Sequence, residues 1–269
     1  MVTRNPNNTL KDMRETIVIT GGMGLLGGAL TDYLTDVGYH VIVVDVLDKT
    51  EIAVDCDYVQ FDLMDINNYH ILKTLIKEKT NNLKILINNA AYNPKIEGKV
   101  GSFGRFEDEK VGNLEKEIKL NLEAPIFLTQ ILLDVFNTNS NKNCKIINVV
   151  STYGLVPPNQ NLYKELSKIE GKEIVKPIGY SVTKAGLIMA TKYLAVYLGD
   201  KGFNVNGVAP GGIENGQNQV FIDEYSRMTP MNRMGKVEEM LGIFELLCGE
   251  KSDYISGQII AVDGGFTVW

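Results

Sequence analysis

Cysteine is scarce in this 269-residue sequence, which contains only Cys56, Cys144 and Cys248, spread along the chain. An odd number of distant cysteines argues against a disulfide framework. Their spacings also match no zinc-binding pattern, so the sequence predicts no metal site. We expect three reduced, buried thiols.

Long apolar runs and an excess of basic residues are missing as well. No stretch approaches the ~20 apolar residues that span a bilayer, and residues 1–15 lack the apolar centre of a signal peptide. The formal net charge of −6 argues against nucleic acid or an anionic membrane as the main partner, because both select basic surfaces. We therefore expect a cytoplasmic protein whose substrate is a small molecule.

Short β-branched runs alternate with helical patterns along most of the chain. This alternation predicts an α/β fold, a doubly wound parallel sheet of about seven strands flanked by helices. Strands are expected at 16–20, 40–44, 57–61, 84–87, 145–150, 203–208 and 258–262. Helices are expected at 29–37, 66–79, 114–136 with a break at Pro125, 180–198, 217–228 and 237–247. Residues 1–14 suit a loose lead-in, and residues 15–269 a single domain.

A glycine-rich run, Gly21-Gly22-Met23-Gly24-Leu25-Leu26-Gly27-Gly28, directly follows the first expected strand. Glycines let the backbone turn sharply and approach a pyrophosphate, whose charge then faces the N-terminus of the next helix. A strand, a glycine turn and a helix in this order therefore predict a dinucleotide site. Glycine spacing without that context would fit any tight turn.

Asp45 ends the second expected strand, at the position that faces the adenosine ribose in such a unit. A carboxylate there accepts hydrogen bonds from both ribose hydroxyls and repels a 2′-phosphate. The glycine turn carries no Arg or Lys that could neutralise such a phosphate. The sequence thus favours NAD over NADP, although Asp45 could instead cap a loop.

Polar residues also follow two further expected strands. Asn88-Asn89-Ala90-Ala91 ends the fourth strand, and Ser151 ends the fifth. Ligands of open parallel sheets bind at the carboxyl ends of the strands, where Gly21 and Asp45 lie too. Asn121 falls inside an apolar helical zone, where its amide needs hydrogen-bond partners.

Tyr180 and Lys184 open a long apolar run that continues to Leu198. Residues four apart lie on one face of a helix, so the phenol and the ammonium are expected to point at the same place. A nearby cation would lower the pKa of the phenol from its usual value of about 10 and suit it to proton transfer. Taken alone, the pair would also fit an ordinary surface contact.

The segment between Ser151 and Tyr180 is rich in charge, and Gly171 and Pro177 limit any helix in it. Four lysines recur there every four residues, interleaved with glutamates: Lys164, Lys168, Lys172 and Lys176. This pattern suits a solvated helix face. The alternative is that some of these lysines bind a phosphate of the substrate.

Taken together, these stretches resemble the short-chain dehydrogenase/reductases over nearly the whole chain, from about Thr16 to Phe266. The resemblance implies a Rossmann-type fold. The matching stretches are TGGMGLLG from Thr20, Asp45, FDLMD with Asp62, INNAA from Ile87, Asn121, VVSTYG with Ser151, YSVTK from Tyr180, VAPGG from Val208 and ISGQIIAVDGG near the end.

The resemblance implies a catalytic tetrad of Asn121, Ser151, Tyr180 and Lys184. Tyr180 would be the acid/base, and Lys184 would lower its pKa and hold the nicotinamide ribose. Ser151 would hydrogen-bond the reacting oxygen. Asn121 would hold a water that links Lys184 to solvent. The implied NAD contacts, besides Asp45, Tyr180 and Lys184, are Gly21, Met23, Gly24, Leu25, Leu26, Asp62, Leu63, Asn89, Ala90, Ala91, Pro210, Gly211 and Ile213.

Three features depart from the compact branch of that family. The middle glycine of the turn is Gly24 where the compact branch has it at the place of Leu25, and this spacing is closer to the extended, sugar-nucleotide-modifying branch. Ser151 and Tyr180 are unusually far apart, which makes 159–176 an expected insertion beside the substrate. Asn215 replaces a threonine that often follows the Pro-Gly turn.

The resulting hypothesis is an NAD(H)-dependent oxidoreductase that interconverts a secondary alcohol and a ketone on a polar, sugar-like or sugar-nucleotide-like substrate. The chain also looks similar to oxidoreductases of surface or flagellar glycan synthesis. One alternative is a ketoreductase for an acyl or other apolar substrate, and a second is a non-catalytic dinucleotide sensor. The apolar run after Tyr180, often a subunit interface in this family, predicts a homodimer or homotetramer.

Overall fold

The computed structural model describes residues 14–48, 56–93, 105–138 and 143–269. The predicted lead-in, apart from Arg14, lies outside the described residues. The described strands form one sheet in the order β3-β2-β1-β4-β5-β6-β7, and every neighbouring pair is parallel. Their bounds are β1 Thr16–Thr20, β2 His40–Asp45, β3 Asp57–Gln60, β4 Leu83–Asn88, β5 Cys144–Val149, β6 Phe203–Pro210 and β7 Ile259–Val262. The predicted seven-stranded parallel sheet is confirmed.

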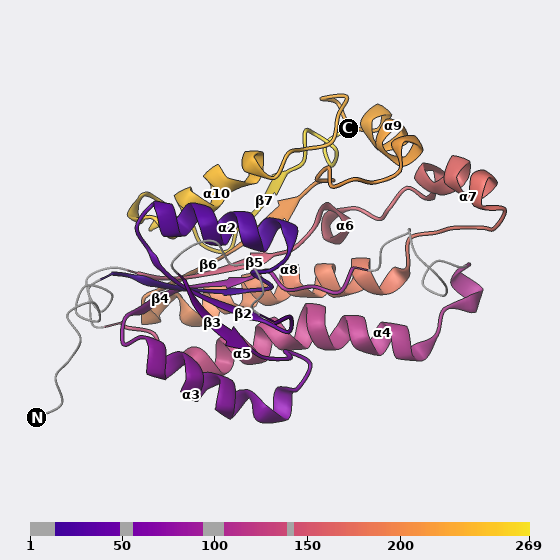
Figure 1. Ribbon diagram of the computed structural model, residues 1–269. Coiled ribbons are helices and arrows are strands. Elements are labelled where there is room, and N and C mark those ends of the chain that lie inside the picture. The colour runs from indigo at the N-terminus through magenta and orange to yellow at the C-terminus, as the bar shows by residue number, and fades with distance from the viewer. Residues whose placement is uncertain (1–13, 49–55, 94–104, 139–142) are drawn as a thin grey trace, which may run out of the picture.

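The central strands are buried along their whole length because helices cover both faces of the sheet. Figure 1 shows α2 and α10 above the sheet and α3 and α5 below it. The helices are α2 Leu25–Asp36, α3 Tyr69–Lys79, α4 Val111–Ile118, α5 Ala124–Leu132, α6 Thr152–Leu155, α7 Lys164–Glu170, α8 Ile178–Leu198, α9 Gln219–Arg227 and α10 Glu238–Cys248.

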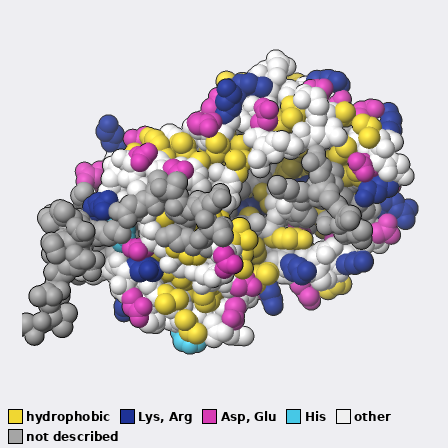
Figure 2. Space-filling view, viewed as in Figure 1, with side chains coloured by type: hydrophobic (Ala, Val, Ile, Leu, Met, Phe, Trp, Pro, Cys, Tyr) yellow, Lys and Arg dark blue, Asp and Glu magenta, His cyan; other side chains and the backbone are white. Residues whose placement is uncertain are grey.

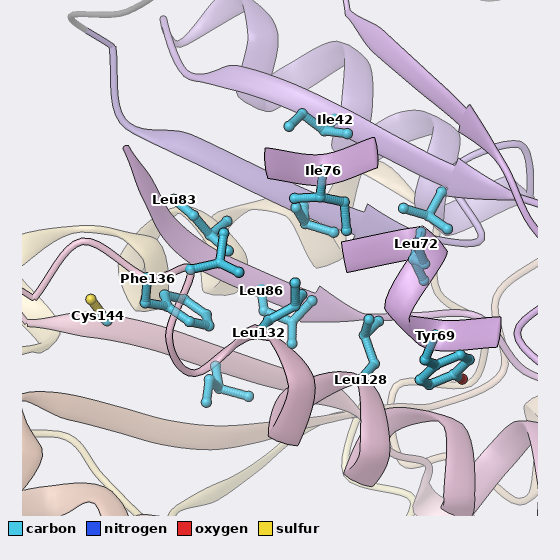
Figure 3. Packing of buried hydrophobic residues seen from close by; sticks show 14 of the residues in the cluster. Ile42, Tyr69, Leu72, Ile76, Leu83, Leu86, Leu128, Leu132, Phe136 and Cys144 are labelled. Atoms are coloured by element: carbon cyan, nitrogen blue, oxygen red, sulfur yellow. The ribbon is translucent and has the colours of Figure 1, made fainter. Parts of the chain in front are cut away.

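Each face of the sheet has its own apolar core. On one face, α3 and α5 bury Leu72, Ile76, Leu128 and Leu132 against the strands, as Figure 3 shows. On the other face, α2 and α10 pack on strand residues such as Ile17, Val43 and Ile85. The three cysteines are free and buried, as expected. Among the described residues, no helix has both the length and the apolar character needed to cross a membrane.

Several predicted helix bounds are wrong by a few residues or more. The helix expected at 66–79 begins with a 3₁₀ turn, η1 (Ile66–Asn68), and α3 starts only at Tyr69. The helix expected to reach Phe136 ends at Leu132. The helix expected to begin at residue 114 starts earlier, because α4 already begins at Val111. Residues 94–104, before it, lie outside the described part.

The predicted insertion at 159–176 contains a 3₁₀ turn, η4 (Gln160–Tyr163), and α7. α7 ends at Gly171, whose φ of 63° is in the left-handed region that glycine adopts readily. The segment packs on α9 through a small apolar cluster: Leu162, Tyr163, Leu166, Ile174, Tyr225 and Met234. In Figure 1, α6, α7 and α9 gather at the right-hand end of the sheet. Because Ser151 leads from β5 into α6, this is the end where the strands finish.

Candidate active site

The glycine turn between β1 and α2 is shaped by close backbone contacts. Gly21 has a φ of 67°, and a Cβ atom on it would lie 2.8 Å from the Cα of Ala90. A Cβ atom on Gly27 would lie only 2.0 Å from the carbonyl oxygen of Gly21. The turn is therefore a tight cradle at the N-terminus of α2, and the first backbone amides of a helix have no partner within the helix, which suits an anion.

Asn89 and Ala90 hold the turn from the neighbouring strand. Their backbone amides both donate to Oγ1 of Thr20 at 3.0 Å, and Nδ2 of Asn89 donates to the carbonyls of Thr20 and Gly21 at 3.0 Å each. The Asn89 side chain thus serves the shape of the turn. Ala91 follows directly, before Tyr92.

Asp45 lies beside the same turn and is buried. Its Oδ2 accepts a hydrogen bond from the backbone amide of Met23 at 2.9 Å, and its Oδ1 accepts one from Leu47 at 3.1 Å. The carboxylate therefore caps its own loop and contacts the glycine turn at once. Of the residues expected near the adenine, Asp62 is exposed and accepts from the amide of Met64, whereas Leu63 is buried.

Asn121 is buried in a short π-helix, η3 (Lys119–Glu123), between α4 and α5. Pro125 has no N–H to donate to the carbonyl of Asn121 four residues earlier, which favours this irregular turn. The amide finds the partners that it needs: Oδ1 accepts from the backbone N of Tyr92 at 2.7 Å, and Nδ2 donates to its carbonyl at 3.0 Å. Nδ2 also lies 3.4 Å from Oγ1 of Thr183 in α8.

Lys184 and Ser151 meet at the end of β5. Nζ of Lys184 donates to the carbonyl of Val149 at 2.7 Å, and the side chain is 2% exposed. Burial lowers the pKa of Lys184 to about 8. Oγ of Ser151 accepts from the backbone amide of Tyr153 at 3.1 Å and so caps α6.

Tyr180 lies between these groups, but its titration differs from the prediction. Nζ of Lys184 is 5.7 Å from the centroid of the phenol ring. The pKa of Tyr180 is raised above its usual value, because burial outweighs a hydrogen bond with Ser151 and the carboxylate of Glu117 adds to the rise. The prediction that the pKa of Tyr180 is lowered is therefore wrong for this arrangement.

The turn after β6 carries the last of the predicted contacts. The amide of Gly211 donates to the carbonyl of Val262 at 2.9 Å, and Ile213 pairs with Gly235 through an isolated bridge. Pro210 is the last residue of β6. The amide of Gly212 donates to the phenol oxygen of Tyr225 at 2.6 Å. Asn215, the replacement for threonine, is exposed.

Two charged residues next to Tyr180 were not among the predicted catalytic or NAD-binding residues. Lys176 was considered only in the alternative that some lysines of its segment bind a phosphate of the substrate. Lys164, Lys168 and Lys172 are exposed, as a solvated face requires, but Lys176 is only 8% exposed. Its Nζ lies 4.6 Å from the centroid of the Tyr180 ring. Glu117 in α4 is 2% exposed. The sequence carried a signal for both, since Lys176 precedes Tyr180 by four residues and Glu117 precedes Asn121 by four.

Comparisons with known proteins agree with this geometry. A family profile described as enoyl-(acyl carrier protein) reductase matches residues 25–267. The chain belongs to the short-chain dehydrogenase/reductase family. As a member of it, the chain is an NAD(P)-dependent oxidoreductase that acts on CH–OH groups.

Three relatives indicate the range of this family. The chain is 24% identical to 7α-hydroxysteroid dehydrogenase of Bacteroides fragilis, over 94% of this chain and 95% of that protein. It is 28% identical to 3-oxoacyl-[acyl-carrier-protein] reductase FabG of Aquifex aeolicus, over 95% and 98%. A short-chain dehydrogenase of Leptospira borgpetersenii with bound NAD+ superposes with a TM-score of 0.83 at 28% identity, over 100% and 98%.

Proposed function

We propose that this short-chain dehydrogenase/reductase interconverts a secondary alcohol and a ketone with NAD(H), in one catalytic domain over residues 15–269. The observation that carries the proposal is the meeting of Ser151, Tyr180 and Lys184 at the end of β5, on the edge of the sheet that also holds the glycine turn. The cradle around Gly21 and Gly27, which leaves no room for a Cβ atom, fits the close approach of a dinucleotide.

In this proposal, Tyr180 exchanges a proton with the oxygen of the substrate. The nicotinamide, when bound, supplies or accepts the hydride. During reduction, the phenol gives its proton to the carbonyl oxygen, and Ser151 orients that oxygen. The raised pKa keeps Tyr180 protonated at neutral pH, which suits an acid in ketone reduction. The ammonium of Lys184 lies near the phenol and is held by its hydrogen bond to the carbonyl of Val149. Asn121 connects η3 with α8 through its contact with Thr183.

Direct titration tests the cofactor part of the proposal. The fluorescence of the purified protein is followed while NADH and, separately, NADPH are added, and a set of ketones is then screened with the tighter cofactor. Tighter binding of NADH supports the proposal. Tighter binding of NADPH would contradict the proposed role of Asp45 but not the assignment to the family. If neither cofactor binds, a folding assay is run on the same preparation. Absence of binding by folded protein would contradict the proposed oxidoreductase function.

Asp45→Ala is expected to lower the ratio of the NADPH dissociation constant to the NADH dissociation constant by about tenfold. This is the effect expected from the loss of one charge-assisted hydrogen bond. The physical reason is the loss of a carboxylate that accepts from ribose hydroxyls and repels a 2′-phosphate. The two dissociation constants are measured for wild type and for Asp48→Ala, a nearby acidic control. An unchanged ratio would show that the ribose lies elsewhere.

The substrate in this proposal is polar, because two buried charged side chains, Lys176 and Glu117, lie beside Tyr180. A sugar-like compound fits this description. Nothing in the relatives named above supports a role in surface or flagellar glycan synthesis. Two of those relatives are named for a steroid and for an oxoacyl carrier-protein substrate, so an apolar ketone remains the second candidate. Activity with hydrophobic ketones alone would favour it.

We also propose that the chain associates with copies of itself through the outer face of α8. Val196 is 86% exposed and Tyr193 is 65% exposed, and a shallow groove there is lined by Met189, Lys192, Tyr193, Val196 and Tyr197. The rings of Tyr193 and Tyr197 are stacked, with centroids 6.1 Å apart. An exposed apolar patch of this kind is typical of a protein–protein interface. If the same patch of two copies meets across a two-fold axis, the product is a homodimer or part of a homotetramer.

Val196→Asp is expected to convert the oligomer to monomer, because a buried unpaired carboxylate opposes association. Sedimentation at micromolar concentration measures the mass of wild type, Val196→Asp and Ile71→Asp, an exposed apolar position on α3 that serves as a control. A monomeric wild type would contradict the proposed association.

A further inference from the structure

Lys176 stands apart from the other lysines of its segment. Lys164, Lys168 and Lys172 are exposed, and Figure 2 shows Lys and Arg side chains on the surface at the right-hand end of the molecule, where α7 lies. Lys176 instead turns inward. Its Nζ donates to Oδ1 of Asn93 and lies 4.6 Å from the centroid of the Tyr180 ring.

The backbone of Lys176 is held in place by the insertion. Its amide donates to Oε1 of Gln160 at 2.9 Å, and its carbonyl accepts from Nε2 of the same side chain at 3.2 Å. Gln160 belongs to η4, which packs on α9. The insertion therefore holds the backbone of Lys176 in place, and the ammonium lies beside the phenol ring without a further rearrangement of the segment.

Glu117 is the carboxylate that faces Lys176 in the interior. It lies against the first turn of α8, since a Cβ atom on Gly179 would come within 1.7 Å of its Oε2. Its Oε1 is buried and has no hydrogen-bond partner among the described residues. Burial and the neighbouring Glu109 raise the pKa of Glu117 to about 7, although the charge of Lys176 lowers it.

Stability does not explain this arrangement well. Taking the charges of Lys176 and Glu117 out of water costs free energy, and their mutual attraction at best offsets that cost. Strongly perturbed ionisable groups that gather beside an acid/base residue are typical of functional sites. Burial lowers the pKa of Lys176 to about 8, so its ammonium is charged at neutral pH and becomes neutral as the pH rises through that value.

We infer that Lys176, Asn93 and Glu117 form a subsite for a negatively charged group of the substrate, a carboxylate or a phosphate, a few bonds from the carbon that reacts at Tyr180. This inference rests on the proposed oxidoreductase function and narrows its polar substrate to an anionic one. The anion pairs with the ammonium of Lys176. Above about pH 7, where Glu117 is ionised, it takes up a proton as the anion binds, so that the anion replaces the Glu117 carboxylate as the negative charge near Lys176.

The sign of the pH dependence follows from this exchange. Below about pH 7, Glu117 is already protonated and Lys176 is charged, so an anion binds without further titration. Above about pH 8, binding requires one proton at Glu117 and one at Lys176, so affinity for the anion falls as pH rises. Among the described residues, Glu109 before α4 acts on Glu117, and Tyr180 in α8 lies beside the pair. Tyr153 in α6 and Lys184 in α8 lie next to Tyr180 in turn.

Matched substrates test the subsite by turnover. Acetoacetate carries one negative charge that methyl acetoacetate lacks. Dihydroxyacetone phosphate carries about two that dihydroxyacetone lacks. The two pairs separate a carboxylate from a phosphate. Wild type is expected to show a higher kcat/KM with the charged member of at least one pair. Lys176→Met should reduce that charged-to-neutral ratio by about tenfold or more, and Lys172→Met, at an exposed lysine, should leave it unchanged. An unchanged ratio in Lys176→Met would overturn the inference.

Direct binding tests the subsite without catalysis. Calorimetric titrations with acetoacetate and with inorganic phosphate are run on wild type, Lys176→Met, Lys172→Met and Glu117→Gln, with circular dichroism as a check on folding and Lys176→Gln as a second variant. Weaker binding by about tenfold in both Lys176 variants supports the inference. In buffers of different ionisation enthalpy at pH 7.5, wild type is expected to take up protons on binding, and Glu117→Gln fewer. No binding of either anion by wild type would contradict the inference.

The two sets of results separate the inference from the proposed function. If the protein binds an anion through Lys176 but binds no NADH and reduces no ketone, the inferred subsite is supported and the proposed oxidoreductase function is contradicted. Ketone reduction whose charge preference is unaffected at Lys176 would retain the oxidoreductase and remove the subsite.

Discussion

Tyr180→Phe is expected to lower kcat/KM for ketone reduction by about 10²–10⁴-fold, the usual contribution of a positioned acid/base group. The substitution removes a single oxygen atom from a side chain whose ring is packed among Ser151, Lys176 and Lys184. The ring, its contacts and the nearby glycine turn remain. Because only the proton donor is lost, the dissociation constant for NADH should stay within about threefold, as expected for an interaction made in the transition state.

The measurement pairs steady-state kinetics with the fluorescence titration of NADH on the same preparations. Tyr254→Phe is the control, since Tyr254 is fully exposed and belongs neither to the site nor to the face of α8 proposed for association. Wild-type turnover in Tyr180→Phe would rule out Tyr180 as the acid/base. Loss of NADH binding together with turnover would instead assign Tyr180 to the cofactor site alone.

The architecture could be predicted because its periodicities are strong. Runs such as Thr16–Thr20 and Val41–Val44 are β-branched throughout, which suits strands covered on both faces. The glycine turn, Asp45 and Ser151 then had to meet at one edge, because all strands are parallel. Helix ends were less predictable: the pattern over residues 66–79 did not distinguish the 3₁₀ turn at Ile66–Asn68 from α3.

The electrostatics of the site could not be predicted from spacing. A four-residue interval placed Lys184 near Tyr180, but spacing gives no measure of burial, and burial is the largest influence on the pKa of both groups. The same interval recurs from Lys164 to Lys176, but the last of these lysines turns inward, where it has tertiary contacts with Gln160 and Asn93. The π-helix at Asn121 likewise depends on how Pro125 is accommodated.

In the glycine turn, the structure gives the individual glycines a different importance from the one that their spacing suggested. The sequence drew attention to Gly24, which departs from the usual spacing of the compact branch. In the structure, a Cβ atom on Gly24 would meet its nearest neighbour, the carbonyl oxygen of Gly21, at 3.4 Å, which is ordinary contact. A Cβ atom on Gly27 would lie 2.0 Å from that same oxygen and 2.7 Å from Nδ2 of Asn89. Gly27, which was not among the predicted NAD contacts, is therefore, like Gly21, a glycine that no larger residue can replace without moving the turn.

Gly27→Ala is accordingly expected to weaken NADH binding by at least about tenfold, because overpacking of this kind costs about 1–3 kcal/mol and would displace the backbone that faces the pyrophosphate. Gly24→Ala should have a smaller effect on the same dissociation constant. Gly28→Ala is the matched control, because its Cβ atom would lie 3.6 Å from the carbonyl oxygen of Gly22, its nearest neighbour. Alanine in place of a helical glycine should raise the free energy of unfolding by about 0.5–1 kcal/mol. NADH titration and thermal unfolding of the three variants distinguish these outcomes. Equal NADH affinity in Gly27→Ala and Gly28→Ala would show that the cofactor does not depend on the shape of this turn.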